Sequence, residues 1–150
     1  MMTIEKLILT WIFSSLLTSY MCILFVKLFG DIKINKKQWI SLMLILSLCH
    51  TVFRNILPQL FFPFLFILYS SLIFAIVVNV KLVKSLKLIV LFFIFLLITE
   101  VIIVILLNIF FNIDVTKITF KIKEYVLSLP VYFIQIYIIY FLRNKFKRKE

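Results

Sequence analysis

Long apolar stretches, separated by short polar segments, follow one another along the chain. The most continuous covers residues 88–111, LIVLFFIFLLITEVIIVILLNIFF, and carries one carboxylate, Glu100, near its middle. A helix needs about 20 apolar residues to cross the hydrocarbon core of a bilayer, and this stretch is long enough. The pattern therefore predicts an all-α integral membrane bundle. Its five predicted transmembrane helices cover residues 7–26, 39–57, 64–80, 88–111 and 125–142.

Polar and helix-breaking residues mark the predicted helix ends. Residues 27–38 form a glycine-containing basic loop, and residues 81–87, KLVKSLK, form a second one. Pro58 ends the second helix and Pro63 starts the third, because proline lacks the N–H that a helix interior uses. Pro130 breaks the fifth helix early. A bundle of four helices, with one apolar run re-entrant, is the alternative.

Lysine and arginine are unevenly divided between the two predicted sides of the membrane. Twelve of them lie in residues 27–38, 81–87 and 143–150, and five lie on the other side. By the positive-inside rule the N-terminus is outside and residues 143–150 are a basic cytoplasmic tail. We therefore expect residues 1–150 to form one multi-pass domain in a bacterial cytoplasmic membrane. Residues 113–124 are either extended or interfacial.

Composition narrows the class of protein further. With 65% hydrophobic residues, the chain has too little polar material to coat a soluble globule. Apolar runs of this length exclude a transmembrane barrel, whose strands alternate in polarity. The net charge of +11 sits at the ends of apolar runs, so it indicates topology and lipid contact rather than nucleic-acid binding. Cys22 and Cys49 both fall inside predicted spans and are interpreted as buried thiols.

Hydroxyl groups form a stripe on the first predicted helix. Ser14 and Thr18, like Ser15 and Ser19, are four residues apart, which places each pair on one helical face. Small polar residues at this spacing let a neighbouring helix approach closely. The stripe is interpreted as a packing surface.

A layer of polar side chains is expected near the middle of the membrane. At 1.5 Å per helical residue, Glu100, His50 and Gln135 all fall within about 3 Å of the bilayer midplane. Ser15 and Ser71 lie at the same predicted depth. Because a charge at the centre of a span is costly, these groups should turn inward and find one another.

Two interpretations of this layer stay open. In the structural one, a neutral Glu100 donates a hydrogen bond to His50 or a hydroxyl and fixes which helices touch. In the functional one, Glu100 lines a ligand or proton site with His50 or Arg54. His50 is the preferred partner, since Arg54 lies about 9 Å nearer the outer face. The candidate ligand-binding or polar-core residues are Glu100, His50, Arg54 and Gln135.

Catalytic patterns are weak in this sequence. Cys49 and His50 are neighbours and point about 100° apart on a helix, so they cannot act as a thiol–imidazole pair. Intramembrane acid chemistry needs two carboxylates, and the predicted spans carry one, Glu100. No metal-ligand, phosphate-loop or serine-elbow motif is present. We therefore expect a non-enzymatic protein without cofactor or metal.

Three successive segments carry a resemblance to a known family. The run FRNILPQLFFPFLFILYSSLIFAI, then KLVKSLK and an acid-bearing span, resembles the N-terminal membrane sensor modules of GHKL-type, agr-like histidine kinases of low-GC Gram-positive bacteria. Such kinases continue into phosphorylatable and ATP-binding domains, which these 150 residues do not contain. The resemblance implies a sensor-like membrane module rather than a kinase. Its matching positions are Arg54, Leu57, Pro58, Lys84, Ser85 and Glu100.

The leading functional hypothesis is therefore a sensor-like or regulatory membrane protein. It would bind a peptide or lipophilic ligand at its outer face and act on a membrane-protein partner or a second copy of itself. The alternative is a bacteriocin-immunity-type or transporter-accessory membrane protein. Neighbouring genes discriminate the two, since a kinase with a response regulator favours the first, and a toxin or an ATPase favours the second.

Overall fold

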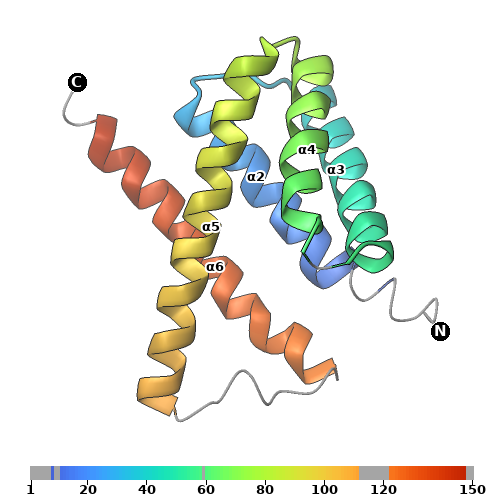
Figure 1. Cartoon of the computed structure of the whole chain (residues 1–150). Coiled ribbons are helices and arrows are strands. Elements are labelled where there is room, and N and C mark those ends of the chain that lie inside the picture. Colours follow the sequence, from blue (N-terminus) through green and yellow to red (C-terminus); the bar gives the residue numbers. More distant parts are fainter. Residues whose placement is uncertain (1–7, 9–10, 59, 112–121, 148–150) are drawn as a thin grey trace. The chain divides into compact units, whose positions relative to one another are not determined.

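The computed structural model describes residues 8, 11–58, 60–111 and 122–147, among which no strand occurs. The described elements are one π-helical turn and five α-helices (Figure 1). The all-α prediction is confirmed for this part of the chain. The elements are η1 (Trp11–Ser15), α2 (Leu16–Phe29), α3 (Lys36–Ile56), α4 (Phe62–Val78), α5 (Leu82–Phe111) and α6 (Ile122–Lys147).

Several predicted helix boundaries are wrong. α3 begins at Lys36 rather than at residue 39. α6 covers Ile122–Lys147, so residues 122–124 and residues 143–147 of the predicted tail are helical.

Two further errors have a physical cause. Residues 82–87, predicted as a basic loop, form the first turns of α5. A lysine marks the edge of the hydrocarbon, but its long side chain can reach water from a helix. The helix therefore begins before the apolar run does. Pro130 lies inside α6 instead of breaking it. Helices tolerate an internal proline when other groups satisfy the freed carbonyl.

Other boundaries follow from local chemistry. α3 begins with a capping box, in which the Asn35 side chain accepts from the Gln38 N–H and the Gln38 side chain accepts from the Asn35 N–H. Pro63 lies in the first turn of α4, as predicted, and α3 ends at Ile56, just before Pro58. α4 ends at Asn79, whose φ of 56° is left-handed, a conformation that asparagine tolerates.

The chain divides into two compact units, Met1–Phe92 and Phe93–Glu150, called unit 1 and unit 2 below. In unit 1, α3 packs against η1 and α2, and also against α4. Residues 21–26 of α2 are each at most 3% exposed. Six successive residues point in every direction around a helix, so this part of α2 is enclosed on all sides.

α2 and α5 also meet inside unit 1. The rings of Phe25 and Phe92 are 5.5 Å apart. At the end of α2, Gly30 lies so close to α5 that a Cβ atom there would be 2.7 Å from Leu88 Cδ1. Ser85 of α5 donates to the carbonyl of Ser71 in α4 at 3.0 Å. The part of α5 in unit 1, residues 82–92, is therefore held against both α2 and α4.

Two described helices are long and apolar enough to cross a membrane, Lys36–Ile56 and Leu82–Ile103. Leu16–Phe29 and Phe62–Val78 are shorter apolar helices. Residues 112–121, which carry most of the segment predicted as extended or interfacial, lie outside the described part of the chain.

Candidate functional site

A row of side-chain hydrogen bonds joins η1 to α3. Trp11 Nε1 donates to Ser47 Oγ at 3.0 Å, and Thr51 Oγ1 donates to Ser15 Oγ at 2.7 Å. Ser15, Ser47 and Thr51 are all buried. These bonds place the polar groups of two neighbouring elements against each other, away from the surroundings of the unit.

Arg54 continues the row toward the end of α3. Its Nη1 donates to Ser14 Oγ, the neighbour of the bonded Ser15. Ser47, Thr51 and Arg54 are spaced four and three residues apart, so they share one face of α3. We call these contacts the η1–α3 ladder: Trp11–Ser47, Ser15–Thr51 and Ser14–Arg54.

The geometry of η1 is unusual. A π-helical turn is rare and is frequent at functional sites. Here it spans Trp11–Ser15, and three of its five side chains, Trp11, Ser14 and Ser15, make the contacts of the ladder. The turn therefore sits where the chain makes its densest described set of interhelical hydrogen bonds.

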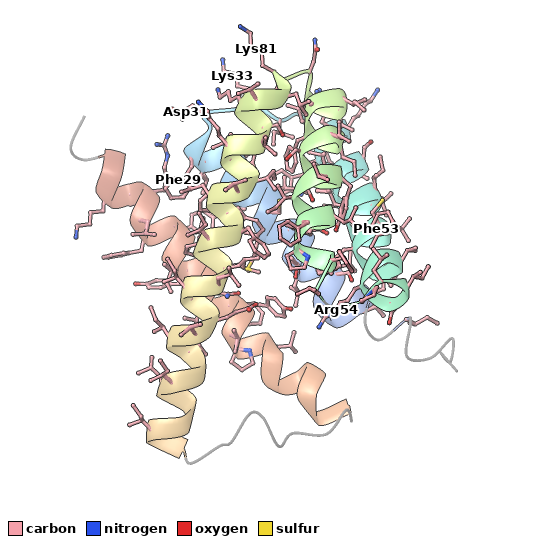
Figure 2. The ribbon with its side chains drawn as sticks, in the orientation of Figure 1. Phe29, Asp31, Lys33, Phe53, Arg54 and Lys81 are labelled. Atoms are coloured by element: carbon pink, nitrogen blue, oxygen red, sulfur yellow. The ribbon has the colours of Figure 1, made fainter. Side chains whose placement is uncertain are left out.

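Arg54 is the exposed end of the ladder. Its guanidinium carries five N–H donors in a fixed fork, and the contact with Ser14 uses a donor of Nη1 only. Figure 2 shows Arg54 at the opposite end of unit 1 from Lys33 and Lys81. A guanidinium is the side chain that pairs best with a carboxylate or phosphate, and this one lies four residues before Pro58.

His50 lies on the same helix but in an aromatic environment. It is 4% exposed, and its ring centroid is 5.0 Å from Phe62 and 5.6 Å from Phe66, both on α4. Its Nδ1 has no hydrogen-bond partner among the described residues. His50 and Glu100 belong to different units, so the pair preferred from the sequence stays a prediction.

Replacing His50 with phenylalanine is expected to change the free energy of unfolding by less than about 1 kcal/mol, because an aromatic ring keeps the packing and no described bond to Nδ1 is lost. His50→Ala should cost about 2 kcal/mol through the cavity it leaves. Thermal unfolding in mild detergent measures both. A phenylalanine variant as unstable as the alanine variant would mean that the imidazole makes a necessary polar contact.

Gln135 and Thr99 form a polar contact inside unit 2. Gln135 is fully buried, and its Nε2 donates to Thr99 Oγ1 at 2.9 Å. Thr99 in turn donates to the carbonyl of Phe95 at 2.9 Å. Glu100, the next residue of α5, is exposed. The predicted core residue Gln135 is therefore bonded to the neighbour of the predicted acid.

Several residues of these contacts were not predicted from the sequence: Trp11, Ser47, Thr51 and Thr99. A usable signal for two of them was present, since Ser47 and Thr51 are one helical turn apart in an otherwise apolar span. The hydroxyl stripe was predicted on the first helix, but its counterpart on α3 was not. Thr99 adjoins Glu100, and of these two neighbours only Glu100 was assigned to the polar layer.

Free thiols and metal-ligand side chains are the remaining candidates for chemistry among the described residues. Cys22 and Cys49 are free thiols, the first buried and the second half-buried. Among the described residues, no group of three His, Cys, Asp or Glu side chains could hold a metal ion. Comparisons with protein-family models, curated proteins and solved structures find no match to this chain.

Proposed function

We propose that this chain is a multi-pass, non-enzymatic membrane protein of the sensor-like or regulatory kind, located in the bacterial cytoplasmic membrane. The observation that best supports this proposal is the inverted polarity of α3. Three of its five buried residues, Ser47, His50 and Thr51, are polar and at most 4% exposed, whereas the middle of its outward face is apolar. The outward residues Leu44, Ile45, Leu48 and Val52 are between 40% and 52% exposed.

This inversion supports a lipid environment. A helix at the surface of a water-soluble protein turns its apolar stripe inward and its polar face outward. In lipid the preference reverses, because hydrocarbon solvates the apolar side chains and polar groups bond across helices. α5 has the same outward character, with Leu91, Ile94 and Ile98 exposed. The length and composition of α3 and α5 are compatible with spans, and we extend this to five helices on the sequence pattern.

The position of Arg54 supports the sensor-like part of the proposal. Under the predicted topology Arg54 lies near the outer face, one turn before Pro58. A peptide carboxylate or other anionic group that drew this guanidinium away from Ser14 would alter the packing of η1 on α3. A ligand contact would in this way become a helix movement. The resemblance to sensor modules supports the same role.

A truncation tests this proposal. A chain lacking residues 143–150 is expected to reach the membrane in normal amount and to lose the transcriptional response that the full chain restores in a deletion strain of its host. The reason is that, in a non-enzymatic sensor, the signal would reach a partner protein through the residues on the cytoplasmic side. RNA sequencing and membrane fractionation measure the two quantities.

The control is a full-length chain with Asn144→Ala, an exposed residue of the same segment that carries no charge. It should restore the response. A truncated chain that restores the response as well as the full chain would refute signalling through this tail. A deletion strain that shows no altered response, but becomes sensitive to an antimicrobial peptide, would favour the immunity-type alternative.

A further inference from the structure

We infer that the lysine-bearing end of unit 1 is a binding surface for anionic lipid headgroups. We call this surface the basic platform, and its lysines are all exposed. The inference rests on the proposal that the chain spans a membrane. The lysines of the platform are Lys27, Lys33, Lys36, Lys37, Lys81, Lys84 and Lys87.

Two connections, distant in sequence, build the platform. One joins α2 to α3 and the other joins α4 to α5. Gln38 Nε2 donates to the carbonyl of Val77 at 3.1 Å, which ties the start of α3 to the end of α4. Gly30 lies against Leu88 of α5. Figure 2 accordingly shows Lys33 and Lys81 at the same end of unit 1.

The charge of the platform is strongly one-sided. Asp31 is the only carboxylate in residues 27–38 and 81–87, against the seven lysines. A surface of this kind attracts anions, and a lysine close to a membrane surface contributes about 1 kcal/mol of attraction to acidic lipids. The platform therefore fits a partner with many negative groups spread over a surface.

The neighbours of the lysines favour lipid over an acidic protein. Ile40, Leu82 and Val83 are exposed apolar residues close to the lysines in sequence. Ammonium groups next to exposed apolar side chains fit the boundary between headgroups and hydrocarbon. An acidic soluble protein has no hydrocarbon to receive these apolar side chains.

An aromatic residue lies at the same level. Lys27 Nζ is 5.3 Å from the ring centroid of Trp39, which also packs edge-to-face on Tyr20 at 5.8 Å. Tryptophan and tyrosine prefer the interface between water and lipid. These rings place the platform at headgroup depth, where an anionic phosphate can reach several lysines together.

Spin-labelled lipids provide the test. The purified full-length chain is reconstituted into phosphatidylcholine vesicles, and the association of labelled phosphatidylglycerol is compared with that of labelled phosphatidylcholine. We expect phosphatidylglycerol to be preferred about threefold or more at low salt, and the preference to fall as salt screens the charges. Equal association of both lipids with a fully inserted protein would overturn the inference.

Matched variants locate the surface. Lys33→Gln, Lys81→Gln and Lys84→Gln, made together, should remove most of the preference. Lys117→Gln, Lys121→Gln and Lys123→Gln remove the same charge from the predicted opposite side and should leave most of it. An equal loss in both variants would overturn the assignment to the platform.

Two further outcomes distinguish a lipid-binding surface from an acidic-protein surface and from a chain that does not insert. Binding of polyglutamate in detergent without any lipid preference in vesicles would show an acidic-protein surface and overturn the inference. Insertion is measured first by resistance to alkaline extraction. A chain that does not insert contradicts the membrane proposal, whereas an inserted chain without lipid preference contradicts the platform alone.

Discussion

Replacing Gly30 with valine is expected to lower the free energy of unfolding by about 3 kcal/mol. A Cβ atom at this position would lie 2.6 Å from the carbonyl oxygen of Val26 and 2.7 Å from Leu88 Cδ1. The carbonyl belongs to the backbone and accepts the Gly30 N–H at 3.0 Å, so it cannot move away without breaking that bond. The cost comes from space, since the φ of −88° suits any residue.

The measurement is thermal unfolding in mild detergent, followed by circular dichroism. Gly30→Ala should fall between the wild type and the valine variant. Lys33→Val introduces the same side chain at an exposed position three residues away and should unfold close to the wild type. If Gly30→Val were as stable as Lys33→Val, the close approach of α2 and α5 would be contradicted.

Removing the α3 side of the η1–α3 ladder is the second expected large effect. The combined variant Ser47→Ala, Thr51→Val and Arg54→Met should lose about 2–3 kcal/mol, given roughly 1 kcal/mol for each interhelical hydrogen bond. Valine keeps the shape of threonine, so the loss reports on hydrogen bonding more than on packing. Reversible unfolding in sodium dodecyl sulfate measures the free energy.

A control removes comparable groups from other positions of α3. Ser41 and Lys37 are exposed, and Ser41→Ala with Lys37→Met should change stability by less than about 0.5 kcal/mol. A double-mutant cycle between Ser15→Ala and Thr51→Val isolates one bond of the ladder. A ladder variant as stable as the control would mean that η1 is held on α3 by packing alone.

The helices were largely predictable from the sequence because their signal is repeated over many residues. Apolar runs located all five α-helices, and proline chemistry located the turn between α3 and α4. The start of α5 at residue 82 and the continuity of α6 through Pro130 were missed. There the apolar run and the hydrogen-bonded helix have different lengths, and only the first can be read from composition.

The candidate site was less predictable, because depth along a helix is readable from a sequence while direction around a bundle is not. Arg54 was considered beside Glu100, and the structure bonds it to Ser14. His50 shares a predicted depth with Glu100, but its described neighbours are Phe62 and Phe66. The choice between such partners depends on which helix packs against which, and that follows from many weak contacts rather than from any one residue.

The enclosure of α2 has a consequence for the order of biosynthesis. α2 leaves the ribosome before α3, α4 and α5, yet its residues 21–26 end up surrounded. Ser15 can meet Thr51 only after 36 further residues have been made. Until then the hydroxyl groups of this first segment can bond only to their own backbone or to groups outside the chain. Contacts between helices of this chain can thus first form when α3 has been synthesised and can pack against η1 and α2.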